Sequence, residues 1–198
     1  MTAINLIGRV LDFWFGPEKS PEFGVKQKKW FQANAEFDSA VTAEFAEDFE
    51  IAATGGYDSL ADSARGSLAL VILLDQFTRN MFRGTARAFA ADAKALSVAR
   101  AAVERGFDQA VPPVLRSFFY LPFEHSEVLA DQQRSVALFE ALGDADWLDY
   151  AIRHREVIVR FGRFPHRNEL LGRENTPEES EFLTQPGSSF GGQTPKEG

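Results

Sequence analysis

The stretch Leu68-Ala69-Leu70-Val71-Ile72-Leu73-Leu74 is the longest uninterrupted apolar run in the chain. It lies in a longer segment, residues 58–82, whose pattern predicts one helix. Because the run is apolar on every side, this helix is expected to be buried at the centre of the fold. The run is far too short to cross a membrane.

Helical periodicity continues on both sides of this central segment. Phe37, Val41, Phe45 and Phe49 follow one another at intervals of four, with acidic residues around them, which indicates an amphipathic helix. Similar patterns predict helices over about residues 4–15, 86–104, 112–142 and 144–161, and a capping box predicts a short one from Thr176. Pro122 is expected to kink or restart the helix that contains it.

The fold class predicted from these patterns is all-α, with about seven or eight helices. No run of alternating β-branched residues and no hairpin turn signal is visible. The length of 198 residues fits a single domain, placed at residues 1–186. Residues 187–198 are rich in glycine and serine, so a disordered tail is predicted there.

Composition excludes several classes of function. The chain has no cysteine, so it has neither a thiol nucleophile nor a cysteine-bound metal. A net charge of −8 disfavours binding to nucleic acid, which normally needs a basic surface. The first residues do not resemble a signal peptide and no segment is long enough to span a bilayer, so a cytoplasmic protein without membrane contact is expected.

Polar residues interrupt the apolar pattern in three places. The first follows the central run directly and contains Asp75, Arg79 and Arg83. Asp75 and Arg79 are four residues apart with the acid first, which is the favourable order for an ion pair on a helix.

The second polar segment is Tyr120–Glu127, which contains Glu124, His125 and Glu127. On one continuous helix Glu124, Glu127 and Asp131 would share a narrow sector. Their mutual repulsion would then have to be offset by solvent, by arginines of another helix or by a cation.

The third polar segment is Arg160–Asn168, with Arg173 beyond it. Four arginines and one acidic residue lie between Arg160 and Arg173, a local excess of positive charge in an acidic protein. Arginine is preferred where paired, partly buried contacts to carboxylates or phosphates are needed. Pro165 keeps the residue before it extended, so a loop is expected at the end of the preceding helix.

Four motifs that occur in order resemble the domain-of-unknown-function family 924. They are Val10-Leu11-Asp12-Phe13-Trp14-Phe15-Gly16, Leu74-Asp75-Gln76-Phe77-Thr78-Arg79-Asn80, Tyr120-Leu121-Pro122-Phe123-Glu124-His125-Ser126-Glu127 and Arg160-Phe161-Gly162-Arg163-Phe164-Pro165-His166-Arg167-Asn168. The resemblance covers about residues 4–190, and Thr78 stands where proline is expected. It implies a bacterial protein with a tetratricopeptide-like fold, and it implies no activity.

Three interpretations of the polar segments remain open. They could form a buried ion-pair network that ties helices together. They could line a pocket that binds or converts a small anionic metabolite held by Arg79, Arg163 and Arg167. The chain could instead be a protein–protein interaction module that uses a concave helical face. Whether the protein is an enzyme is left undecided.

The candidate residues follow from the pocket interpretation. No metal site is predicted, because the spacings typical of helical metal sites are absent, and no cofactor is expected. His154 lies on an apolar helical face and is interpreted as a core residue. The acid–base candidates are Glu124, His125 and Glu127, and the ligand-binding candidates are Asp75, Arg79, Arg83, Arg163, His166, Arg167 and Asn168.

Overall fold

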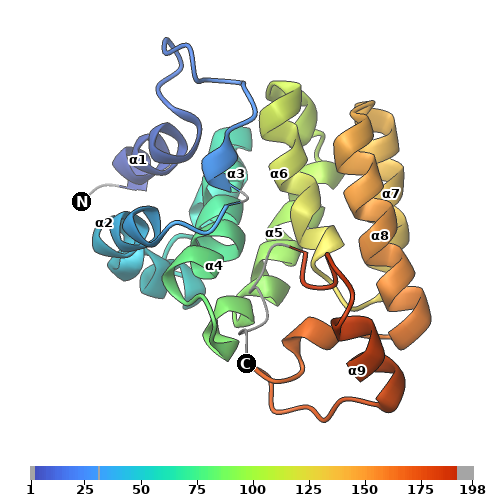
Figure 1. The fold of residues 1–198 in the computed structure, drawn as a ribbon. Coiled ribbons are helices and arrows are strands. Elements are labelled where there is room, and N and C mark those ends of the chain that lie inside the picture. The colour runs from blue at the N-terminus through green and yellow to red at the C-terminus, as the bar shows by residue number, and fades with distance from the viewer. Residues whose placement is uncertain (1–2, 31, 191–198) are drawn as a thin grey trace.

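A computed structural model describes residues 3–30 and 32–190, and within these ranges the chain is helical without a strand (Figure 1). The helices are α1 (Ala3–Phe15), α2 (Ala35–Ala53), α3 (Ala64–Val71), α4 (Phe77–Met81), α5 (Asp92–Glu104), α6 (Pro113–Glu124), α7 (Leu129–Leu142), α8 (Ala145–Phe161) and α9 (Pro177–Leu183). A π-helical turn, Ile72–Gln76, joins α3 to α4 without a break. Counted that way, the described ranges hold eight helices, which confirms the all-α prediction.

The apolar run lies where its composition predicts, in the middle of the molecule. All seven residues from Leu68 to Leu74 are buried. They are covered by α1, α5 and α6, and large aromatic side chains such as Trp14, Phe77 and Phe118 pack edge to face beside them. Aromatic pairs of this kind add to the gain from burying their surface, so this cluster is the main source of stability.

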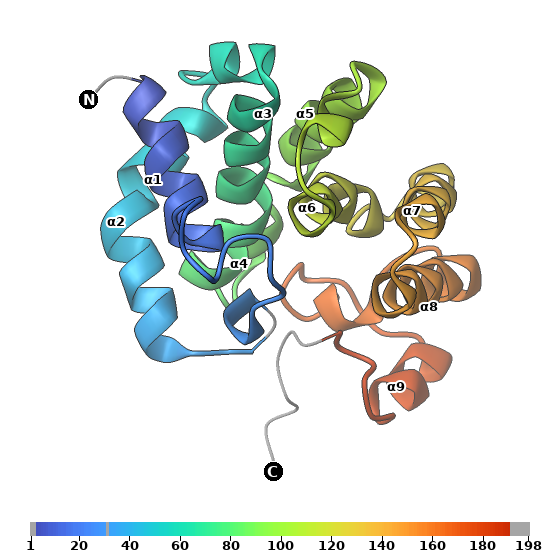
Figure 2. The same cartoon turned by 90° about the horizontal axis from the view of Figure 1, so that it is seen from above.

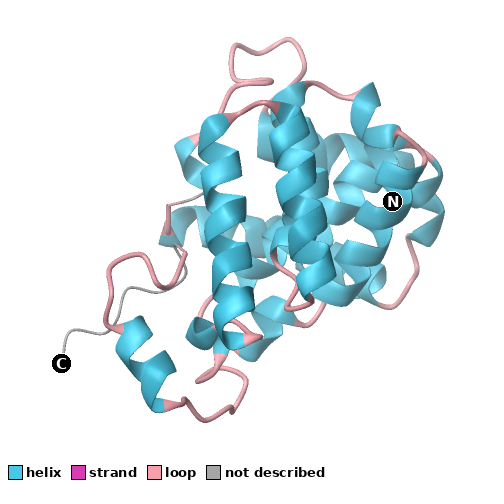
Figure 3. Cartoon of the chain, turned by 90° about the vertical axis from the view of Figure 1, so that its right-hand side faces the viewer, coloured by secondary structure: helices cyan, strands magenta, loops and turns pink. Residues whose placement is uncertain are grey.

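The helices stand side by side in a curved row. Seen from above, α1, α3, α5, α6, α7 and α8 follow one another in chain order, each packed against the next (Figure 2). α2 covers the other side of α1 and contacts α4. After α8 the chain turns back through a loop into α9, which lies below the row (Figure 3).

The turn at the end of α8 decides where the third polar segment goes. Gly162 ends the helix with a φ of 69°, a left-handed conformation that glycine adopts without strain. α9 then begins with the predicted capping box, in which Thr176 and Glu179 satisfy each other's backbone N–H groups. The residues between Gly162 and Thr176 contact Glu127 in the connection between α6 and α7, and the Phe164 ring packs against His154 of α8.

The predicted restart of the helix at Pro122 does not occur, and the helix predicted over residues 112–142 is divided further along. α6 runs through Pro122 and ends at Glu124, and α7 begins only at Leu129. Glu124 and Glu127 therefore do not lie on one continuous helix, and the narrow sector of three carboxylates does not form. The break instead directs Glu124 and Glu127 into different surroundings.

The described part of the C-terminal segment has a defined position. Residues 187–190 form a turn, and the Phe190 ring stacks on His154 with a centroid distance of 3.8 Å. These four residues belong to the segment for which disorder is predicted, and residues 191–198 lie outside the described ranges. No helix in the described part of the chain is both long and apolar enough to span a bilayer.

Candidate functional site

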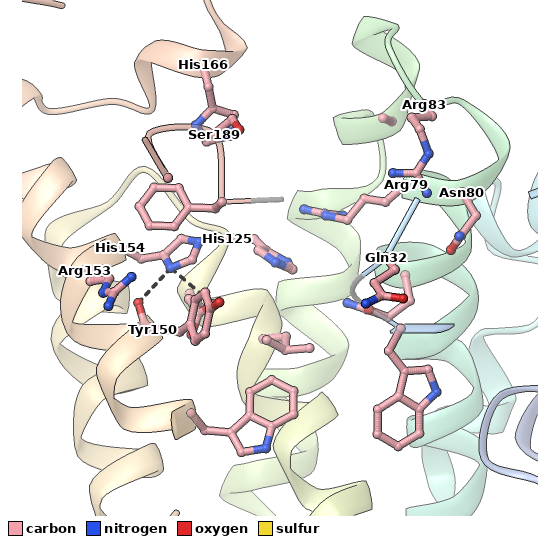
Figure 4. A pocket seen from close by; sticks show the side chains of 18 of the residues that line it. Gln32, Arg79, Asn80, Arg83, His125, Tyr150, Arg153, His154, His166 and Ser189 are labelled. Carbon is pink, nitrogen blue, oxygen red and sulfur yellow. Dashed lines mark hydrogen bonds and ion pairs between the residues drawn. The ribbon is translucent and has the colours of Figure 1, made fainter. Parts of the chain in front are cut away.

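A cavity of about 790 Å³ opens between α4, α6 and α8 (Figure 4). The segment before α2 and the turn at residues 187–190 complete its walls. Of the ten predicted site residues, six line this cavity: Arg79, Arg83, Glu124, His125, His166 and Arg167. They come from all three polar segments, so these segments do meet at one place.

His125 is held by a buried carboxylate. Its Nδ1 lies 2.7 Å from Oδ1 of Asp75, which is buried in the π-helical turn beneath the cavity. Burial opposes ionisation of Asp75, but Arg79 and His125 outweigh it and hold its pKa below the usual range. Burial and the charge of Arg79 lower the pKa of His125, so its ring is neutral at neutral pH. An ionised carboxylate only accepts, so the single ring proton lies on Nδ1 and Nε2 keeps its lone pair.

Glu124 precedes His125 in the chain, and its pKa is shifted in the opposite direction. Its side chain is 3% exposed, and its Oε2 has no hydrogen-bond partner among the described residues. Burial, and then the negative charge of Asp75, raise the pKa of Glu124 to about 8. The carboxyl is therefore mostly protonated at neutral pH.

The ring of His154 lies beside the Glu124 carboxyl. Its Nδ1 donates a 2.8 Å hydrogen bond to the carbonyl oxygen of Tyr150 and lies 3.3 Å from Oε1 of Glu124. Burial lowers the pKa of His154 well below its usual value, so this ring is neutral too. The chain has three histidines, and all of them line this cavity.

The four arginines that line the cavity differ in how completely they are paired. Arg153 pairs with Asp149 at 2.8 Å. Arg83 donates two hydrogen bonds to Asp38, of 2.7 and 3.0 Å, and Arg79 donates two to Asp92, of 3.0 and 3.1 Å. The expected ion pair between Arg79 and Asp75 is also present, at 3.2 Å.

Arg167 is the exception. It is 7% exposed, yet its only hydrogen bond to the described residues is a long one, 3.4 Å from Nη1 to Asp92, and its buried Nε has no partner. The guanidinium lies 4.6 Å from the ring centres of both Phe89 and Phe164. Burial lowers the pKa of Arg167 to about 10, so it stays charged at neutral pH.

Aromatic side chains also line the cavity, among polar ones such as Gln76 and Asn80. They are Trp30, Phe89, Trp147, Tyr150 and Phe190, of which Trp147 and Tyr150 both come from α8. The Phe190 backbone has a φ of 49°, a conformation that is unusual for a residue other than glycine. Such flat side chains suit a flat ligand ring, with which they can stack.

The other four predicted residues lie outside the cavity. Glu127 accepts hydrogen bonds of 2.8 and 2.9 Å from Arg173, and another of 2.8 Å from the backbone N–H of Phe164. Arg163 donates to Glu179, at 2.6 and 2.7 Å, and Asn168 donates to Asn175 at 2.8 Å. Asp75 does not touch the cavity but holds His125 from below.

No metal centre is indicated. Within residues 3–30 and 32–190 no group of three or more histidine, aspartate or glutamate side chains is arranged to bind a metal ion. The chemistry available in the cavity is therefore that of a neutral carboxyl, unprotonated imidazole nitrogens and a guanidinium with free donors.

Sequence reasoning missed some residues of the site. His154 has the buried, apolar surroundings predicted for it, but it also lines the cavity. Asp92 begins α5 and pairs with both Arg79 and Arg167, although only its place in a first helical turn distinguishes it in the sequence. Phe190 lies in a glycine-rich stretch, and no pattern there signals a docked ring.

Comparisons with known proteins identify relatives but no activity. The family model for bacterial proteins of unknown function, DUF924, matches residues 10–187. The solved structure of the protein of unknown function ATU0120 from Agrobacterium tumefaciens is 44% identical, with a TM-score of 0.83, over 92% of this chain and 98% of that one. A search of curated proteins found no match. This chain belongs to the DUF924 family, as its four motifs indicate.

Proposed function

We propose that the protein binds a small organic anion with a flat ring in the cavity between α4, α6 and α8. The observation that carries this proposal is Arg167, a buried guanidinium with most of its donors unused. A buried charge whose hydrogen-bond donors are mostly unused is costly, so an anionic group on a ligand is the natural complement. The other arginines of the cavity, Arg79, Arg83 and Arg153, are already paired with carboxylates, which leaves Arg167 as the anchor among them.

The size and lining of the cavity support a metabolite-sized ligand. A volume of about 790 Å³ lies within the range of small-molecule sites. The aromatic walls offer apolar surface, and Glu124, His125 and His166 offer a few convergent polar groups. Burial and the neighbouring charge of Arg167 lower the pKa of His166 to about 3, so the ring is neutral and does not compete for the anion.

The residues outside the cavity favour a second interpretation for part of the motifs. Glu127 accepts hydrogen bonds from Arg173 and from the backbone N–H of Phe164, and Arg163 donates to Glu179. These hydrogen bonds support a structural network that fixes the loop between Gly162 and Thr176 to α9 and to the connection between α6 and α7. The network and the binding cavity thus use different residues of the same motifs.

Three broader expectations belong with this proposal. A cytoplasmic location fits the absence of a spanning helix from the described part of the chain. A tetratricopeptide-like arrangement fits the curved row of helices. The alternative of a protein–protein interaction module has less support, because the unpaired polar groups of Glu124 and Arg167 are buried, whereas a module would display them on an open face.

The first prediction tests Arg167 with thermal unfolding. We expect benzoate or phenyl phosphate to raise the melting temperature of the wild type, because a ligand of the folded state stabilises it. The shift should disappear in Arg167→Met, which keeps the length of the side chain and removes the charge. Arg134→Met is the control, since Arg134 is exposed on α7 and has no hydrogen bond or ion pair to the described residues.

Two results would contradict the proposal. One is an equal shift in Arg167→Met and wild type, which would place the anion elsewhere. The other is no shift with either probe in the wild type. Because Arg167→Met removes a buried charge, its melting temperature without ligand is not expected to fall sharply, so a folded variant is available for the comparison.

A further inference from the structure

Glu124 and His125 are neighbours in sequence and line the same cavity, one as a potential proton donor and the other as a potential proton acceptor. The His125 Nδ1 is occupied by Asp75, so its Nε2 is the nitrogen left to act, and no described residue donates to it. The Glu124 Oε2 is buried without a partner. One group can accept a proton and the other can give one.

The fold fixes the positions of both the His125 ring and the Glu124 carboxyl. Asp75 lies in the π-helical turn, where Arg79 and Gln76 also bond its carboxylate, at 3.2 and 2.6 Å. A histidine oriented through a carboxylate on its other nitrogen has a defined tautomer and ring orientation. Glu124 is held at the end of α6, beside His154.

The protonation states agree with this geometry. Burial and the charge of Asp75 keep the proton on Glu124, whereas burial and the charge of Arg79 keep it off His125. In solution a histidine binds its proton more tightly than a glutamate, so the site has reversed the usual order. Pairs whose surroundings shift their affinities in this way are typical of acid–base catalysis.

We propose that Glu124 and His125 are the general acid and general base of an enzyme that interconverts the keto and enol forms of a 2-oxo acid carrying a flat ring. This inference rests on the proposed function, because Arg167 would hold the carboxylate and the aromatic walls the ring. The carbonyl oxygen then faces the Glu124 carboxyl, and the carbon beside the carbonyl faces His125.

The step needs no other reactant. His125 Nε2 takes a proton from the carbon beside the carbonyl, and the C–H electron pair becomes a C=C bond. The π electrons of the carbonyl take the proton of Glu124, which forms the enol and leaves an imidazolium and a carboxylate. The reverse step returns both protons and restores the ketone, so atoms and charge balance.

The experiment uses phenylpyruvate with the full chain in D₂O. We expect the wild type to speed the exchange of the protons beside the carbonyl for deuterium, relative to buffer alone. Proton NMR measures this exchange. General acid–base groups contribute roughly 10²-fold or more, so Glu124→Gln and His125→Gln should each lose about that factor. Glu140→Gln, an exposed carboxylate on α7, is the control and should exchange at the wild-type rate.

A second measurement separates the role of Asp75 from simple stability. Nitrogen NMR of labelled histidine should show the His125 proton on Nδ1 in the wild type. In Asp75→Asn the amide can donate to Nδ1, which should move the proton to Nε2 and abolish exchange in a folded protein. An imidazolium at His125 at neutral pH would overturn the assignment of the base.

The two proposals can fail separately. If benzoate stabilises the protein and phenylpyruvate is neither bound nor exchanged, the acid–base inference is wrong and the anion site stands. The same holds if phenylpyruvate is bound but its exchange is no faster than in buffer. If neither benzoate nor phenyl phosphate stabilises the wild type, the proposed function fails, and the catalytic inference falls with it.

Discussion

Glu124 and Glu127 belong to one short segment, yet their carboxyl groups have opposite surroundings. Glu124 lies in the cavity wall, and Glu127 lies outside the cavity, in a region that we call the corner, formed by Glu127, Arg173 and Phe164. At the corner, Arg173 and the backbone of Phe164 satisfy Glu127, and although burial opposes its ionisation, these partners lower its pKa. At the cavity, Glu124 has an oxygen without a partner and a raised pKa. Satisfied groups hold the fold, and unsatisfied ones are available to a ligand.

The largest effect expected from this contrast is a dependence of stability on pH. The folded chain holds a proton on Glu124 up to about pH 8, whereas the ordinary pKa of glutamate is 4.5. The stability from that proton is complete below pH 4.5 and is lost as the pH rises through the folded pKa. Relative to Glu124→Gln, the wild type should lose about 1.4 kcal/mol per pH unit between these values.

Urea unfolding of both proteins at pH 5, 6.5 and 8 measures this difference. The lowered pKa values of the three histidines contribute in the opposite direction below about pH 6.5, but they are present in both chains and cancel. Parallel stability curves for wild type and variant would show that Glu124 is ionised in the folded state.

A smaller effect is expected at the corner. Glu127→Gln weakens the bonds from Arg173 and from the Phe164 N–H, and hydrogen bonds to charged groups are worth about 2 kcal/mol. The free energy of unfolding should fall by about that amount at neutral pH, as measured by urea unfolding. Stabilisation by benzoate should persist, since Glu127 does not line the cavity.

Glu140→Gln again provides the comparison, because an exposed substitution of the same kind should change stability by less than about 0.5 kcal/mol. Loss of the benzoate response in Glu127→Gln, with the protein still folded, would show that the corner and the cavity are not separate.

The smallest effect concerns the turn that closes the cavity. Phe190→Ala removes the ring that stacks on His154, and an aromatic contact of this kind is worth about 1 kcal/mol. The composition of residues 187–198 predicts no loss, whereas the contact predicts a fall in melting temperature and weaker binding of benzoate. Truncation after Gly187 should reproduce both effects. An unchanged melting temperature would instead support the disordered tail that the composition predicts.

Much of the fold could be read from the chain because local signals and burial agree there. The run from Leu68 to Leu74 can only be a buried element, and Gly143 and Gly162 mark helix ends with left-handed backbones. Pro122 misled the prediction because a buried helix can tolerate a proline when its packing outweighs the lost hydrogen bond.

The site was harder to predict because it depends on where loops send their side chains. Arg163 and Arg167 are four residues apart after the same helix, but the turn at Gly162 directs Arg163 to Glu179 and Arg167 into the cavity. Helical periodicity does not apply in such a loop. The sequence therefore identifies both arginines as candidates, but it does not predict which of them lines the cavity. The same reason applies to Phe190.

The π-helical turn has a consequence for how this chain tolerates insertions and deletions. A π-helical turn holds one residue more than the α-helical turn it replaces. Deleting one residue between Ile72 and Leu74 would let the segment rewind as regular α-helix, and the residues after it would keep nearly the same orientation. A deletion in the regular α-helical turns of α3 would instead rotate everything after it by about 100°. Asp75 and Arg79 would then point away from His125, so a one-residue deletion should be tolerated in the π-helical turn and not in α3.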